Sequence, residues 1–90
     1  AIVPETVGQF LIRGATPIHE INRRLGLELD SEDVDTFSGL LVTLLGDIPQ
    51  PGDRVELPGA TAEVLEVKGA RATLVRVTIK DRTNEPADSV

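Results

Sequence analysis

The sequence predicts an α+β domain in which two helices pack on a small, mainly antiparallel sheet, in the order β-α-α-β-β-β. Two segments show the helical spacing of apolar residues, and a glycine follows each of them. Three later segments, separated by turn-forming residues, show the pattern of sequential strands. With 90 residues, the chain is large enough for one domain with a single core.

The domain itself is expected over residues 7–79, between a linker at 1–6 and a disordered tail at 80–90. Pro4 disfavours regular structure in the first segment, and the last segment is almost devoid of apolar side chains. The sequence contains no methionine, so Ala1 is not an unprocessed start. We expect the chain to be a piece of a longer protein rather than the product of leader removal.

The first strand is expected over 7–13, where a short apolar run stops at Gly14. The first helix is expected to begin with Thr16 as its cap and Pro17 at its first position, where the missing amide costs nothing. Gly26 would end this helix. Its apolar stripe consists of Ile18, Ile21 and Leu25, and Asn22 lies beside it.

The second helix runs between a cap at Thr36 and a stop at Gly46. Its apolar face consists of Phe37, Leu40, Leu41, Leu44 and Leu45. Burial of each of these side chains stabilises the fold by about 1.5–3 kcal/mol before entropy is subtracted, so this helix should anchor the core. Gly39, inside the helix, is expected to let another backbone approach closely.

The remaining strands are expected over 55–57, 61–67 and 71–79. Pro58 and Gly59 fit the middle of a type II turn, which predicts a tight hairpin. The alternation is irregular in the middle strand, so we expect either a bulge there or a strand covered on both faces. The predicted core consists of Phe37, Leu40, Leu41, Leu44, Val64, Val75 and Val77.

Composition excludes several classes of function. The net charge of -6 and the pI near 4.6 argue against binding to nucleic acid or to anionic membranes. No apolar run approaches the length of about 20 residues that a membrane helix needs, so we expect a soluble fragment without direct membrane insertion. The chain has no cysteine, which fits a reducing compartment.

The sequence indicates that the protein is not an enzyme. His19 is the only histidine and lies outside the apolar stripe of its helix, which is typical of a surface residue. None of the serines lies in the context of a nucleophile elbow. The segment 14–17 is the nearest candidate for a phosphate or flavin cradle, but it lacks the glycine pattern of dinucleotide sites. We therefore expect no resident cofactor.

A divalent-metal site is the sharpest chemical hypothesis. The candidate ligands for Mg²⁺ are Asp30, Glu32, Asp33 and Asp35, in an acidic segment that also contains Glu28. Magnesium prefers oxygen ligands and often needs only one or two protein carboxylates. The other reading of the same residues is a solvated loop whose charge interacts favourably with the dipole of the helix that follows.

The order and spacing of several short motifs resemble the CorC/HlyC transporter-associated domain over residues 5–78. The matching motifs are Gly-Ala-Thr-Pro-Ile-His-Glu-Ile-Asn at 14–22, Leu-Gly-Leu at 25–27, Asp-Thr-Phe-Ser-Gly-Leu at 35–40, Leu-Gly-Asp-Ile-Pro at 45–49, Pro-Gly-Asp at 51–53 and Glu-Val-Leu-Glu-Val at 63–67. The stretch 60–62 departs from the family, in which it is more aromatic.

The resemblance implies a fold similar to part of a flavin-binding domain, with no catalytic residues. It implies a C-terminal module of a magnesium and cobalt efflux protein, at the cytoplasmic face of the cell membrane, after a membrane domain and a CBS pair. We expect a regulatory role through docking on these neighbours or through homodimer formation, at a sheet edge or on the exposed face of the last strand. A sensor that binds Mg²⁺, a nucleotide or a flavin directly is the alternative.

Overall fold

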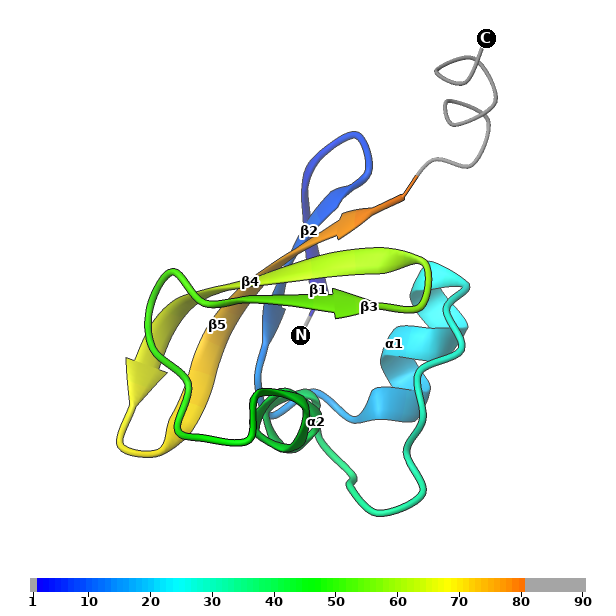
Figure 1. Ribbon diagram of the computed structural model, residues 1–90. Helices are drawn as coiled ribbons and strands as arrows, with labels where there is room; N and C mark the ends of the chain where they lie inside the picture. Colours follow the sequence, from blue (N-terminus) through cyan, green and yellow to red (C-terminus); the bar gives the residue numbers. More distant parts are fainter. Residues whose placement is uncertain (1, 81–90) are drawn as a thin grey trace, which may run out of the picture.

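The computed structural model describes residues 2–80, so all of the tail expected at 80–90 except its first residue lies outside the described residues. The elements are β1 (Ile2–Thr6), β2 (Gln9–Arg13), α1 (Ile18–Leu25), α2 (Phe37–Leu45), β3 (Arg54–Leu57), β4 (Ala60–Lys68) and β5 (Arg71–Ile79). The five strands form one antiparallel sheet in the order β1-β2-β5-β4-β3. Both helices lie on the same side of it, which confirms the α+β prediction (Figure 1).

Strand β1 occupies the segment in which the sequence predicted a linker. It pairs with β2, and Ile2, which is opposite Ile12, is buried in the core. Pro4 is compatible with this strand because β1 is an edge of the sheet, where a missing amide need not interrupt a ladder. The prediction gave too much weight to the proline and missed a fifth strand.

The core lies between the sheet and the helices. From β2, β4 and β5, the fully buried side chains are Ile12, Val64, Val75 and Val77, together with Ala60 and Ala62. The predicted alternation along β5 is confirmed, since Val75 and Val77 are buried while Arg76 and Thr78 are partly exposed. The expected bulge in β4 is also present, as a shift of register between Val64 and Glu66.

The starts of the two helices are joined to each other. The amide of Ile18 donates to the carbonyl oxygen of Asp35 at 2.9 Å, and the amide of Phe37 donates to that of Thr16 at 3.0 Å. The structure differs from the prediction at the start of α1, since Pro17 rather than Thr16 is the N-cap residue, and Pro17 makes no side-chain capping hydrogen bond. Pro17 is extended and forms an isolated antiparallel bridge with Thr36, just before α2.

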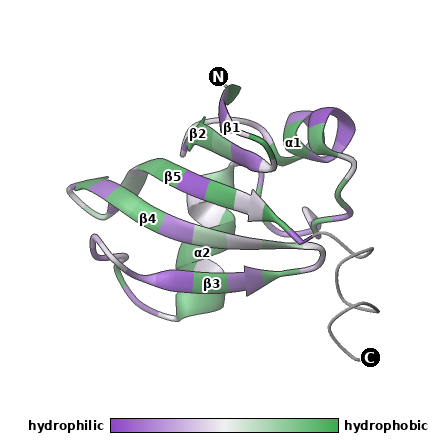
Figure 2. Ribbon diagram, turned by 90° about the horizontal axis from the view of Figure 1, so that it is seen from above, coloured by the Kyte–Doolittle hydropathy of each residue, from purple (hydrophilic) through white to green (hydrophobic). Residues whose placement is uncertain are grey.

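Both predicted ends of α2 are confirmed. The hydroxyl oxygen of Thr36 accepts a hydrogen bond from the amide of Gly39 at 3.2 Å, and Gly46 adopts the left-handed conformation with φ of 75°. Along the apolar face, Phe37, Leu40 and Leu41 are buried. Leu44 is half exposed, contrary to the prediction, because the C-terminal end of α2 reaches the β3 edge of the sheet (Figure 2).

The close backbone approach predicted at Gly39 occurs at Gly14 instead. A Cβ atom at Gly39 would meet only side-chain atoms at 3.4 Å or more, which is ordinary contact. A Cβ atom at Gly14 would overlap the carbonyl oxygen of Ala72 in β5. Gly14 therefore allows the chain leaving β2 to cross directly against β5, which places the start of both helices on the sheet.

We predict that Gly14→Ala destabilises the fold by about 2 kcal/mol or more, because the strands must separate to make room for the methyl group. Gly39→Ala is the matched control, and it should be neutral or stabilising by up to about 1 kcal/mol, since alanine is the better helix residue. Urea denaturation of both variants checks this. Equal stability of the two variants would show that the approach at Gly14 is not tight.

Candidate functional site

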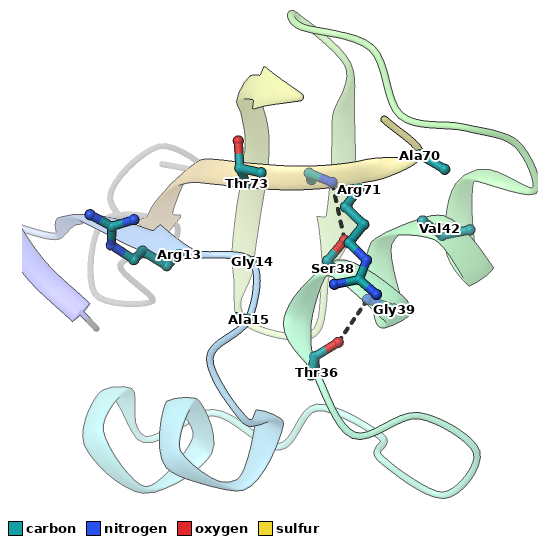
Figure 3. Close-up of a pocket in the computed structure, with 11 residues that line it drawn as sticks. Arg13, Gly14, Ala15, Thr36, Ser38, Gly39, Val42, Ala70, Arg71 and Thr73 are labelled. Atoms are coloured by element: carbon teal, nitrogen blue, oxygen red, sulfur yellow. Dashed lines mark hydrogen bonds between the residues drawn. The ribbon is translucent and has the colours of Figure 1, made fainter. Parts of the chain in front are cut away.

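A cavity of about 480 Å³ opens where the loop after β2, the first turn of α2 and the β4–β5 hairpin meet (Figure 3). Its lining combines small apolar residues with three hydroxyl-bearing side chains and two arginines. The lining residues are Arg13, Gly14, Ala15, Thr36, Ser38, Gly39, Val42, Ala70, Arg71, Ala72 and Thr73. Each of the three segments that form the cavity is held to the others by hydrogen bonds.

Ser38 is the centre of these bonds. Its Oγ accepts a hydrogen bond from the amide of Ala72 at 3.1 Å, in a buried position, and its own amide donates to the carbonyl oxygen of Gly14 at 2.8 Å. The amide of Gly14 in turn donates to the carbonyl oxygen of Thr73 at 3.2 Å. This structural role was not predicted from the sequence, in which its one signal is a serine in the first turn of an apolar helix.

The first amides of α2, at the cavity, are already paired within the protein. Helix N-termini bind anions through unpaired amides, but the amides of the first turn of α2 donate to Thr16, Gly14 and Thr36. In the segment proposed as a phosphate or flavin cradle, the amides of Gly14 and Thr16 are also paired within the protein. Figure 3 shows Arg71 lying over the start of α2, whereas Arg13 points away from it.

The acidic residues proposed as magnesium ligands lie on the connection between the helices, and all of them are exposed. The Oδ1 atom of Asp30 accepts a hydrogen bond from the amide of Glu32 at 2.9 Å. Within residues 2–80, no three carboxylate or imidazole groups are gathered closely enough to hold a metal ion. His19 is exposed, as predicted.

The same connection is tied to α1 by one side chain. Asn22 Nδ2 donates to the carbonyl oxygen of Leu29 at 3.0 Å, and Asn22 Oδ1 accepts from the amide of Leu29 at 2.8 Å. Leu27 and Leu29 are buried. The start of the connection is therefore fixed to the core, while its carboxylates point to solvent.

The sheet face away from the helices carries a row of alternating charges, which we call the charge ladder: Arg54, Glu63, Arg76 and Glu5. Arg76 lies opposite Glu63 in the register of β4 and β5, with 3.5 Å between Nη1 and Oε1. Two nitrogen atoms of Arg76 also donate to both carboxylate oxygens of Glu5, at 2.9 and 3.2 Å. Because Glu5 is in β1, this pair reaches across β2 and holds the edge strand to β5.

The ion pairs of this face change the acidity of its carboxyl groups. The hydrogen bond from Arg76 lowers the pKa of Glu5, and the same pair raises the pKa of Arg76. At the other end of the sheet, Lys80 Nζ lies 2.7 Å from Glu56 Oε1, and this hydrogen bond lowers the pKa of Glu56. These groups are solvent-exposed, so each pair stabilises the fold only modestly.

The sequence of this chain matches the family model described as Transporter associated domain, CorC_HlyC, over residues 4–81. The chain belongs to the CorC/HlyC transporter-associated domain family. The match includes strand β1 from Pro4, together with both helices and the remaining strands.

The relatives of this CorC/HlyC domain are longer proteins. It is 31% identical over 72 residues to the magnesium and cobalt efflux protein CorC of Vibrio cholerae, covering 80% of this chain and 25% of that protein. It is 33% identical over 66 residues to a UPF0053 protein of Haemophilus influenzae, covering 73% of this chain and 16% of that protein. The domain thus spans a quarter or less of the length of these two relatives.

Solved structures share the fold of this CorC/HlyC domain over nearly its whole length. A hemolysin domain from Enterococcus faecalis superposes with a TM-score of 0.81 at 30% identity, covering 89% of this chain and 98% of that one. A CorC_HlyC domain of a Xylella fastidiosa hemolysin, in complex with Mg²⁺ and Mn²⁺, superposes with a TM-score of 0.79 at 29% identity, covering 89% and 98%.

We predict that Ser38→Ala destabilises this CorC/HlyC domain by about 1–3 kcal/mol, because the buried amide of Ala72 loses its acceptor. Thr43→Ala is the control: its hydroxyl bonds to the carbonyl oxygen of Gly39 at an exposed position, so its loss should cost less. Thermal and urea unfolding of both variants check this. A Ser38→Ala variant as stable as the parent would contradict the assigned role of the hydroxyl.

The Glu5–Arg76 pair should make the stability of the domain depend on pH. A pKa lowered by folding means that the unfolded state binds more protons, so the stabilisation is present above the pKa of the unfolded state and is lost as pH falls through the folded-state pKa of Glu5. In Arg76→Gln, the pKa of Glu5 should rise, as measured by carboxyl NMR titration. Arg23→Gln removes the same charge from α1 and should leave the titration of Glu5 unchanged.

Proposed function

We propose that this domain is a non-catalytic accessory module of a larger membrane protein that exports divalent cations such as Mg²⁺ and Co²⁺. It regulates transport by docking on neighbouring parts of that protein, namely the membrane domain and a CBS pair at the cytoplasmic face, or on a second copy of itself. The observation that carries the proposal is the family match over residues 4–81, together with a relative named as a magnesium and cobalt efflux protein.

The geometry of the domain supports a role in docking rather than in chemistry. Within residues 2–80, the buried hydroxyl of Ser38 holds two segments together, and no group of three potential metal ligands is assembled. The same residues include no helix that is both long and apolar enough to cross a bilayer. A small body fixed by hydrogen bonds at the Ser38 junction is suited to transmitting a change of position.

The test uses the full-length protein that carries this domain. In cells loaded with magnesium, we expect deletion of the domain to change the rate of Mg²⁺ efflux, because the regulating contacts are lost while the transport pathway remains. Ser38→Ala, placed in the full-length protein, should shift the rate in the same direction when the temperature approaches the melting point of the variant domain. An efflux rate unaffected by the deletion would overturn the regulatory role.

Direct sensing of a cation is the second candidate, favoured by one observation: the related Xylella fastidiosa domain was solved with Mg²⁺ and Mn²⁺. The ligands proposed here are Asp30, Glu32, Asp33 and Asp35. Since their side chains are exposed and not gathered in this structure, binding would require the connection to rearrange around the ion. Leu29, held by Asn22, would be the fixed point of that rearrangement.

An amide NMR titration with MgCl₂, using NaCl at equal ionic strength as the control, tests this candidate. Binding should give saturable shifts confined to residues 28–35. Asp30→Asn combined with Asp33→Asn should remove them, whereas Asp47→Asn, an exposed carboxylate elsewhere, should not. Shifts that match the NaCl control, or that persist in the double variant, would overturn this assignment.

A further inference from the structure

We propose that two copies of this chain associate through their β3 strands, which pair antiparallel about a two-fold axis at Val55 and join the two sheets into one. Dimer formation would be one form of the docking proposed above, and its relevance to transport rests on that proposed function. The other edge of the sheet, β1, contains Pro4 and so lacks a donor that a second strand would need.

The main chain of β3 has groups available for pairing. The amide of Val64 in β4 donates to the carbonyl oxygen of Asp53 at 2.8 Å, so this carbonyl group faces β4, while the amide of Asp53 donates to Gln50 in the preceding turn. Because successive residues of an antiparallel strand direct their main-chain groups to opposite sides, the carbonyl and amide groups of Val55 also face β4, whereas those of Arg54 and Glu56 face outward. A strand added at this edge would bond to Arg54 and Glu56.

The side chains at those two positions make the edge complementary to itself. Arg54 and Glu56 are both exposed and lie on the same face of the sheet, with Val55 buried between them on the other face. A two-fold axis at Val55 places Arg54 of each copy opposite Glu56 of the other, so that opposite charges meet twice and like charges do not. The charge ladder, which ends at Arg54 in one copy, would continue into Glu56 of the next.

An apolar surface lies beside the same edge, on the helix side. Leu44 and Ile48 are each 50% exposed, and Figure 2 shows the C-terminal end of α2 at the β3 edge. The nine residues of α2 include no charged side chain, and a helix without a polar face is normally covered on all sides. The two-fold axis that pairs β3 also brings Leu44 and Ile48 toward the same residues of the second copy.

The interface is small, since Pro51 and Pro58 bound the pairing segment and β3 has only four residues. Interfaces of this size are weak and depend on concentration. A symmetric contact of this kind is closed, because the same patch is used on both copies and no free β3 edge remains for a third.

Sedimentation equilibrium over a range from micromolar to millimolar chain tests the proposal. The parent chain should shift from monomer to dimer as concentration rises. Glu56→Arg should abolish this shift, because Arg54 would then face an arginine, and Arg54→Glu should abolish it for the converse reason. Glu32→Arg makes the same change of charge at an exposed position outside β3, and it should dimerise at least as well as the parent chain.

A mixture of the two single variants gives the most specific test of the pairing. Mixed in equal amounts, Arg54→Glu and Glu56→Arg should form a heterodimer, because each glutamate of one chain then faces an arginine of the other. Circular dichroism establishes that each variant is folded. A parent chain that stays monomeric, a Glu56→Arg variant that still dimerises, or a folded mixture that does not associate would each overturn the proposal. These results concern the isolated chain, so the pairing can fail while the effect of domain deletion on efflux stands.

Discussion

The structure depends on the place where Gly14, Ser38 and Ala72 meet. The chain leaving β2 crosses against β5 there, at a distance that only glycine allows, and the first turn of α2 is bonded to both segments. The starts of α1 and α2 are bonded to each other a few residues away. The position of each helix on the sheet therefore follows from this junction, and the apolar contacts of Phe37 and Leu41 fill the space that it defines.

In this arrangement the amides of the first turn of α2 are occupied by bonds within the chain, whereas helix N-termini often offer theirs to anions. The amides of this turn donate hydrogen bonds to carbonyl and hydroxyl oxygens of the same chain, so the turn joins α2 to the loop that follows β2. The nearby cavity is lined by the segments so joined, and of its two arginines Arg71 lies over the start of α2. Other charges of the domain lie on the outer sheet face, on the acidic connection and on α1, where Arg24 pairs with Glu20.

Sequence reasoning found the features that depend on local pattern. The caps at Thr36 and Gly46, the alternation in β5 and the bulge in β4 are all set by a few neighbouring residues, and the structure confirms them. Features set by distant contacts were missed. Strand β1 exists because Ile2 packs in the core beside β2, and Gly14 rather than Gly39 is constrained because β5 lies against it. The sequence pattern of the acidic connection is the same for a cation site and for a solvated loop, so it does not distinguish the two.

The direction of β1 has a mechanical consequence. β1 and β5 are both antiparallel to β2, which lies between them, so they run parallel to each other. Consider a force that pulls the N-terminal end of β1 and the C-terminal end of β5 in opposite directions along the strands. Such a force shears the hydrogen bonds of the β1–β2 and β2–β5 pairs all at once, rather than breaking them one after another. The bond from Arg76 to Glu5 acts across the same strands. If neighbouring parts of a protein were attached at these two strands, the domain would transmit a pulling force between them without loss of its edge strand.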